Sequence, residues 1–197
     1  MHSAAAPTTI AVQISHSWTT QAGQLIRIRP ITQHDVDRVA AYLDGLSVGT
    51  RYFRFGRWDT RFSRDELVKI CNPDPAECRR LIAVTEQDGR EIQIASAAYV
   101  ITNDRESGEF SILVADQWQG TRVAHRLMSH LIQSAREFGL RRICAQVLGT
   151  NSRMIRFAQR HGFKLAPGAQ ETQIKTLILL LDDDTSVPDQ LPAVQTG

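Results

Sequence analysis

The sequence predicts one α/β domain, built around a mixed but mostly antiparallel sheet of about seven strands with about four flanking helices. Two observations carry this prediction. Three apolar segments follow one another at residues 81–85, 92–101 and 109–115, which favours an antiparallel meander. The third segment is followed by an amphipathic helix and by another strand at 141–148. That order favours one parallel pair joined by a right-handed crossover.

An arm, a strand and a helix are predicted at the N-terminus. Residues 1–23 are small, polar and poorly patterned, so we expect a flexible arm there. Residues 25–29 alternate apolar and basic side chains, as a half-buried strand does, and a proline follows them. Thr32 is a suitable N-cap for a helix with one apolar face. The domain is therefore expected to span residues 24–182, with a flexible tail over residues 183–197.

One more helix is predicted before the meander. Residues 47–55 are rich in aromatic residues and arginine, but their periodicity is weak and favours no regular element. Ser63 and Glu66 form a capping-box pattern that opens a helix, and the two prolines within residues 72–75 end it. The Asp-Gly pair at 88–89 then marks the hairpin between the first two strands of the meander.

Strands and helices alternate in the last part of the domain. Residues 119–124 form a turn, and apolar residues then recur every three or four positions over 123–138, which predicts an amphipathic helix. A short helix is predicted at 152–160. The run TLILLL at 176–181 predicts a last strand that is fully buried.

Composition and charge argue against several classes of function. The net charge is only +2 over 197 residues, so a nucleic-acid partner is not expected. No apolar run approaches the roughly 18 residues of a membrane span, and no signal-peptide pattern is present, so we expect a cytoplasmic protein without a membrane partner. Cys71, Cys78 and Cys144 are unclustered and lack a histidine at metal-ligand spacing. We expect free thiols and no metal site.

The turn at residues 119–124, QGTRVA, is the first candidate binding site. It would place several free backbone N–H groups at the N-terminus of the following helix, where the helix dipole attracts anions. This arrangement favours a phosphate ligand. A helix start with a single glycine is also ordinary structure, so the turn alone does not establish a site.

Five segments carry a resemblance to a known family. They are IRPI at 28–31, LSVGTRYFRF at 46–55, EFS at 109–111, WQG at 118–120 and NSRMIRFAQRHGF at 151–163. Together with the order of elements, they resemble the GNAT acetyltransferases, and in particular the catalytic domain of bacterial Pat-type protein lysine acetyltransferases. The resemblance covers about residues 25–182 and implies a GNAT-like fold with acetyl-CoA as co-substrate.

The resemblance also implies where coenzyme A binds. Its pyrophosphate would meet the N–H groups of the turn, and its pantetheine arm would lie along the preceding strand. The residues expected to contact it are Ile112, Leu113, Val114, Gln119, Gly120, Thr121, Arg122, Val123, Ala124, His125 and Asn151. Gln119 and Ala124 match the family's phosphate-turn pattern, whereas Arg122 replaces its central glycine and would either bind a phosphate or obstruct the turn. For Asn151, the simpler interpretation is a helix cap.

Glu109 is the candidate general base. By itself, a carboxylate at the start of an apolar strand is a solvated edge residue. The five residues from Glu109 to Val114 span roughly 17 Å of extended strand, which is comparable to the reach of a pantetheine arm. In Pat-type enzymes the matching glutamate is the general base. Many GNAT enzymes also carry a tyrosine acid at the position of Ala158, so here water or another group would protonate the leaving thiolate.

The expected function is acetyl transfer to an amine, with a protein lysine as the first choice of acceptor. Arg51, Tyr52 and Arg54 are expected to form the acceptor wall; alternatively they are an aromatic cluster with its arginines turned to solvent. A small-molecule amine is the second choice of acceptor. The alternative to an enzyme is a non-catalytic regulatory module that binds acyl-CoA. The sequence leaves open whether the chain forms a homo-oligomer.

Overall fold

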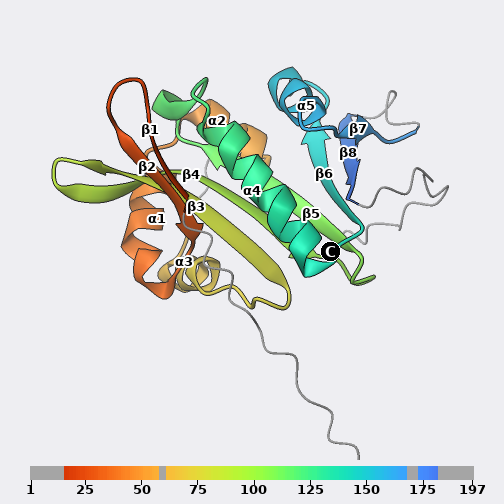
Figure 1. Cartoon of the computed structure of the whole chain (residues 1–197), viewed down its shortest axis with the longest axis horizontal. Helices are drawn as coiled ribbons and strands as arrows, with labels where there is room; N and C mark the ends of the chain where they lie inside the picture. Colours follow the sequence, from red (N-terminus) through yellow and green to blue (C-terminus); the bar gives the residue numbers. More distant parts are fainter. Residues whose placement is uncertain (1–15, 58–60, 168–172, 182–197) are drawn as a thin grey trace, which may run out of the picture.

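The computed structural model describes residues 16–57, 61–167 and 173–181. Its centre is an eight-stranded sheet in the order β1-β2-β3-β4-β5-β6-β8-β7 (Figure 1). Every neighbouring pair is antiparallel except β5 and β6, which run parallel. The mixed, mostly antiparallel sheet predicted from the sequence is thus confirmed. The expected tail at 183–197 lies outside the described residues.

The elements have the following bounds. The strands are β1 (His16–Thr19), β2 (Leu25–Pro30), β3 (Cys78–Gln87), β4 (Arg90–Ile101), β5 (Ser107–Val114), β6 (Arg142–Leu148), β7 (Lys164–Leu165) and β8 (Ile174–Leu180). The helices are α1 (Val36–Asp44), α2 (Val48–Phe55), α3 (Arg64–Cys71), α4 (Val123–Phe138) and α5 (Ser152–Gln159), with 3₁₀ turns at η1 (Gln33–Asp35) and η2 (Asp116–Trp118). No helix in the described ranges is both long and apolar enough to cross a membrane.

Strands β1 and β8 differ from the sequence prediction. β1 lies within residues 1–23, where a flexible arm is expected, but it pairs antiparallel with β2 and Trp18 packs against the core. The described fold therefore begins before residue 24. β8 is expected to be fully buried, yet only Leu177 is completely so. The short β7 beside it leaves the end of the sheet partly open to solvent.

Helix α2 occupies the segment whose periodicity is weak. Ser47 caps its N-terminus by accepting a hydrogen bond from the backbone N–H of Thr50. Gly56 ends it with a φ of 71°, in the left-handed region that glycine favours. The helix buries none of its residues completely. Its 8 residues make only about two turns, which is too short for a clear period in the sequence.

Helices cover both faces of the sheet. α4 crosses one face, where Leu127 and Leu131 are fully buried against Tyr99 of β4 and against β2 (Figure 1). α1 and α3 cover the other face and pack on Ile82 and Val84 of β3. Residues of one strand alternate between these two cores, which is the pattern of a three-layer α/β/α domain.

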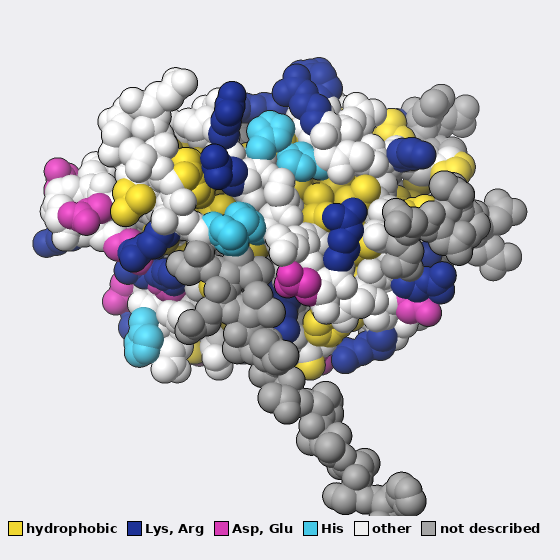
Figure 2. Space-filling view, viewed as in Figure 1, with side chains coloured by type: hydrophobic (Ala, Val, Ile, Leu, Met, Phe, Trp, Pro, Cys, Tyr) yellow, Lys and Arg dark blue, Asp and Glu magenta, His cyan; other side chains and the backbone are white. Residues whose placement is uncertain are grey.

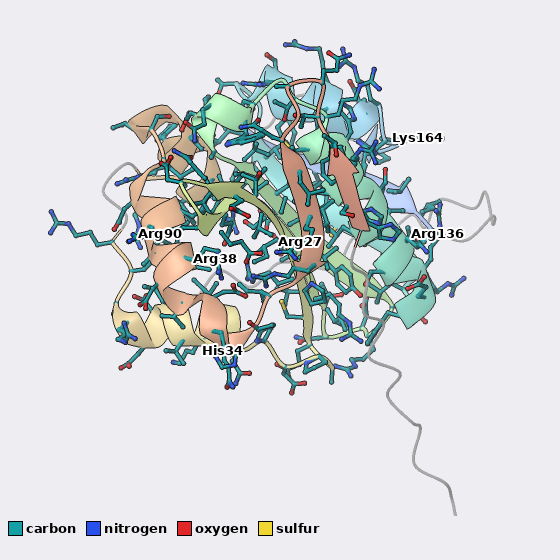
Figure 3. The ribbon with its side chains drawn as sticks, turned by 60° about the vertical axis from the view of Figure 1, so that its left-hand side comes forward. Arg27, His34, Arg38, Arg90, Arg136 and Lys164 are labelled. Carbon is teal, nitrogen blue, oxygen red and sulfur yellow. The ribbon has the colours of Figure 1, made fainter. Side chains whose placement is uncertain are left out.

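A network of three arginines and two carboxylates joins β2, α1 and β4. The guanidinium of Arg29 donates two hydrogen bonds of 2.8 Å to the carboxylate of Asp35, which is 1% exposed. Arg29 also lies 2.7 Å from Glu91. Arg38 pairs with both acids, and Arg27 pairs with Glu91. Figure 3 labels Arg27 on β2 and Arg38 on α1. We call this group the Asp35–Glu91 network.

Strands β5 and β6 touch over a short distance only. Their parallel pairing spans Ser107–Glu109, after which the two strands diverge. Gly108 sits at the point of contact, where an added Cβ would lie 2.9 Å from a side-chain carbon of Leu140. A larger residue would therefore force the side chain of Leu140 to move. The divergence beyond Glu109 opens the sheet from within.

Candidate active site

A large cavity lies where β5 and β6 diverge. It measures about 1270 Å³ and is bounded by β5, β6, the N-terminal end of α4, α5 and α2. The lining residues include most of those predicted from the sequence: Glu109, Ile112, Leu113, Val114, Gln119, Gly120, Thr121, Arg122, Ala124, His125, Asn151 and Arg54. Val123 is 1% exposed and is not among them, so it belongs to the core. We call this cavity the cleft.

The backbone of β5 offers hydrogen-bonding groups to the cleft. Backbone groups of a paired strand point alternately to its two neighbours. The N–H of Ala115 donates to a carbonyl of β4 at 2.9 Å, so Leu113, two residues earlier, also faces β4. Ile112 and Val114 face the opposite side, where β6 pairs only with Ser107–Glu109. The N–H groups of Ile112 and Val114 are thus turned toward the cleft, whereas that of Leu113 is not.

The turn before α4 presents backbone N–H groups at the end of the cleft. Gly120 has a φ of 83°, which favours glycine and turns the chain into the helix. Arg122 is the N-cap residue, and no described side chain caps the amides of Ala124 and His125. The side chain of Arg122 is exposed and lines the cleft. The replacement of glycine by arginine therefore adds a cation to the cleft wall.

Gln119 links three elements around the cleft. Its amide nitrogen lies 3.2 Å both from the hydroxyl of Thr50 on α2 and from the carbonyl of Val114 on β5. Its amide oxygen accepts a hydrogen bond of 2.5 Å from Arg153 on α5. Because both ends of this amide are engaged, Gln119 holds the walls of the cleft in place and has little capacity left to bind a phosphate.

Asp116 anchors α2 to the end of β5, a contact that the sequence analysis does not predict. Its carboxylate accepts hydrogen bonds from the backbone N–H of Ser47 at 2.9 Å and from the hydroxyls of Ser47 and Thr50 at 2.7 Å. Burial opposes its ionisation, but these hydrogen bonds outweigh burial and lower its pKa. The anchor fixes α2 as one wall of the cleft.

The cleft carries a strong positive charge. The residues that line it include five arginines, namely Arg54, Arg122, Arg153, Arg156 and Arg160, against one carboxylate, Glu109. Figure 2 shows Lys and Arg side chains gathered along the top edge of the molecule, near histidines. Nδ1 of His125 and Nε2 of His161 lie 2.9 Å apart, and both rings pack on Phe157. A ligand with several negative charges fits this surface.

Glu109 lies in the cleft on the face of β5 that is turned toward α1 and α2. Its side chain is exposed and forms no ion pair or hydrogen bond within the described part of the chain. It pairs across the sheet with Val100 of β4 and Cys144 of β6. Burial and the Glu109 carboxylate raise the pKa of the Cys144 thiol to about 11. Cys144 is therefore protonated at neutral pH and unsuited to act as a nucleophile.

Comparison with known proteins now decides the family. The family model described as an acetyltransferase (GNAT) domain matches residues 26–164. This chain belongs to the GNAT acetyltransferase family. Acetyltransferase PA5475 of Pseudomonas aeruginosa is 28% identical over 121 residues, which are 61% of this chain and 65% of that protein. The chain thus spans somewhat less than two thirds of that curated relative.

Solved structures share the fold. The GNAT domain of S. lividans PAT has a TM-score of 0.74 and 27% identity, with 84% of this chain and 96% of that one covered. A putative acetyltransferase from Salmonella typhimurium, solved with its cofactor acetyl-CoA, has a TM-score of 0.63 and 18% identity, covering 84% and 99%. The spermidine N-acetyltransferase of Vibrio cholerae, in complex with CoA and spermine, gives 0.63 and 20%, covering 79% and 95%. The last two show the fold alone.

The three residues expected to form the acceptor wall of this GNAT domain do not all line the cleft. Arg54 lines the cleft, whereas Arg51 and Tyr52 do not. The guanidinium of Arg51 turns back and donates to the carbonyl of Asp44 at 2.6 Å. Tyr52 packs edge-on against Phe53, which does line the cleft. One of the three predicted side chains therefore faces the space where an acceptor would bind.

The last helix of the GNAT domain supplies a cap and no acid. The side chain of Asn151 accepts a hydrogen bond of 3.1 Å from the backbone N–H of Met154, so it caps α5 while it lines the cleft. Ala158 is fully buried. None of the three tyrosines, Tyr42, Tyr52 and Tyr99, lines the cleft. Proton delivery to a leaving thiolate would have to come from water or from a residue of another type.

Proposed function

We propose that the chain transfers an acetyl group from acetyl-CoA directly to the side-chain amine of a protein lysine. The observation that carries this proposal is the joint presence, in one cleft, of uncapped amides at the start of α4, an unpaired edge of β5 and the carboxylate of Glu109. The likeness to the GNAT domain of S. lividans PAT supports lysine as the acceptor.

The cofactor would lie along β5. Its pyrophosphate takes the amides of Ala124 and His125, and the arginines of the cleft balance the remaining phosphate charge. Its pantetheine arm runs toward Glu109, with polar groups opposite the N–H of Val114 and the backbone of Ile112. This orientation leaves the thioester between the oxyanion donors and the base.

Glu109 would activate the amine. A lysine ammonium has a pKa of about 10.4 in water, so a base must remove its proton before attack near neutral pH. Glu109 takes this proton, directly or through a water molecule. The amine nitrogen then bonds to the thioester carbon, and the N–H of Val114 stabilises the oxyanion. The C–S bond breaks to release the thiolate, which receives the excess proton of the attacking nitrogen through water. Cys144 takes no part, because its thiol stays protonated.

The decisive experiment measures thiol release from acetyl-CoA in the presence of lysine-containing proteins. We expect turnover in the natural chain and a fall in kcat of about 10²–10⁴-fold in Glu109→Gln, the usual contribution of a general base. Acetyl-CoA affinity should stay the same, because Glu109 lies at the far end of the arm from the phosphates. Glu106→Gln, an exposed glutamate in the preceding turn, serves as the matched control.

Two outcomes would contradict parts of the proposal. Tight acetyl-CoA binding without release of thiol to any protein or small amine would indicate a non-catalytic acyl-CoA-binding module. An unchanged kcat in Glu109→Gln would contradict only the assignment of Glu109 as the general base.

A further inference from the structure

A second cavity adjoins the cleft beside Glu109. It measures about 220 Å³ and lies between the sheet and helices α1, α2 and α3. Arg54, Ser111 and Leu113 line both cavities, so the two cavities adjoin at these residues. Most of the remaining wall is apolar, with Phe55 and Phe62 among its members. The cavity is large enough for a small polar group and a few methylene carbons.

The strand register places this cavity next to the proposed base. Arg80 of β3 pairs with Ala98 of β4, which in turn pairs with Ser111 of β5. Residues paired across strands share a face, so Arg80 and Ser111 lie on the face that also carries Glu109. Ser111 and Glu109 are two residues apart on the strand, about 7 Å. A molecule whose amine meets Glu109 could therefore reach into the cavity.

Two arginines line this cavity without a carboxylate partner. Arg54 and Arg80 form no ion pair with any acid in the described ranges. The Nε of Arg80 and the side-chain oxygen of Gln93, which is 6% exposed, are buried and have no hydrogen-bond partner there. Unpaired polar groups in a partly apolar cavity are costly, and the cost disappears when a ligand satisfies them.

The charges around Arg54 agree with this reading. Burial in the wall and the positive charge of Arg80 lower the pKa of Arg54, although the side chain stays in contact with the solvent of the cleft. The carboxylate of Glu109 acts on Arg54 in the opposite direction and raises its pKa, but in the proposed function Glu109 binds the acceptor amine. An anion between Arg54 and Arg80 would relieve the repulsion between the two guanidinium groups.

From these observations we propose that the cavity is an anion subsite, in which Arg54 and Arg80 bind a carboxylate of the acceptor several bonds from the amine that is acetylated. A carboxylate fits because two guanidinium groups can bind its two oxygens, while the apolar wall accepts the attached methylene carbons. The carboxylate would belong to an ω-amino acid or to an acidic residue beside a target lysine. This inference rests on the proposed acetyl transfer.

The test compares two acceptors that differ only in charge, δ-aminovalerate and its neutral amide. In the natural chain we expect kcat/KM for the carboxylate to exceed that for the amide by at least about tenfold, which corresponds to one charge-assisted contact. Arg54→Gln and Arg80→Gln should each bring the ratio toward one. Equal values in the natural chain for this pair and also for the pair of dipeptides described below, or a ratio that survives both substitutions, would overturn the subsite.

Arg79→Gln is the matched control. Arg79 is the neighbour of Arg80 on β3, but it pairs with Tyr99 and lies 5.8 Å from the ring of Phe138 on α4, so it serves the opposite face of the sheet. It removes the same charge from the same strand without touching the cavity. The preference for the carboxylate should stay unchanged in this variant.

A second pair of acceptors identifies the source of the carboxylate. Blocked dipeptides with glutamate or glutamine before the lysine differ only in that charge. A preference confined to the dipeptides places the carboxylate on a protein, and one confined to δ-aminovalerate places it on a small molecule. Both results support the subsite.

Binding of glutarate separates this inference from the proposed function, because glutarate has no amine to acetylate. It is titrated by calorimetry into the CoA-bound protein. If glutarate binds to the natural chain but not to Arg80→Gln, and no acceptor is acetylated, the subsite is supported and the proposed acetyl transfer is contradicted. If neutral amines are acetylated but glutarate does not bind, the acetyl transfer is supported and the subsite is contradicted.

Discussion

Two groups of arginines occupy the same face of the sheet and differ in what surrounds them. In the Asp35–Glu91 network, three arginines share two carboxylates, and Asp35 is 1% exposed. Around the second cavity, Arg54 and Arg80 form no ion pair with a carboxylate in the described part of the chain. Both groups follow from the arginine-rich composition, so the residue type alone does not distinguish them.

The difference shows how a structural charge is recognised. An arginine that is paired with a buried carboxylate has its hydrogen-bonding groups engaged, and loss of that carboxylate destabilises the fold. An arginine that is held in a cavity without a partner contributes nothing to folding by its charge, but it can bind an anion. Three predictions distinguish the two groups by the free energy of unfolding. This quantity should depend on the Asp35–Glu91 network and not on the arginines of the cavity.

The largest effect is expected from Asp35→Asn. This change removes the buried one of the two carboxylates that Arg29 and Arg38 share, so the free energy of unfolding should fall by up to about 3–5 kcal/mol. Urea denaturation measures the loss. Asp37→Asn is the control, because Asp37 pairs with Arg64 at 3.2 Å on the surface and should change stability by less than about 1 kcal/mol. Similar losses in both variants would contradict a special role for the network.

The second effect is the dependence of the network on pH. Burial opposes ionisation of Asp35, but hydrogen bonds from Arg29 and Thr32 outweigh it and lower the pKa to about 2 from the ordinary 3.8. A carboxyl whose pKa is lower in the folded state stabilises the fold above its unfolded pKa. This contribution, on the order of 2 kcal/mol, should be lost as the pH falls from about 4 to 2.

Thermal unfolding across this pH range measures the effect. In Asp35→Asn the fall in stability over the same interval should be shallower than in the natural chain. Parallel curves for the two proteins would show that other carboxyl groups dominate acid unfolding.

The smallest effect is expected from Arg80→Gln. Because Arg80 has no acidic partner in the described residues, its loss should leave the free energy of unfolding within about 1 kcal/mol of the original value or raise it slightly. The same denaturation experiment measures this. A loss of more than about 2 kcal/mol would show that Arg80 supports the fold, and its assignment to a ligand would then lose its basis.

Local patterns in the sequence predict the central elements well. The apolar run of β5, the amphipathic period of α4 and the glycine between them place the turn and Glu109 at one cavity. These features depend on neighbours a few residues apart. Helix α2 also carries local signals, since Ser47 and Gly56 are suitable caps, but its 8 residues are too few for a periodicity search to identify it.

Contacts between distant residues could not be predicted. Asp116 binds Ser47 and Thr50 across 66 to 69 positions of chain, and no local rule pairs them. Arg80 appears as one of several charges at the start of β3, and only the register with β4 and β5 brings it beside Ser111. Sequence patterns assign residues to elements, whereas the cavity arises from how three elements align.

The short contact between β5 and β6 has a consequence for motion. The sheet is joined by seven residue pairs between β4 and β5 and by seven between β6 and β8, but by only three between β5 and β6. Cooperative opening follows the weakest boundary of a structure. Amide hydrogens of β6, β8 and α5 should therefore exchange as one unit, faster than those of β3 and β4, and a bound cofactor that spans the gap should slow them.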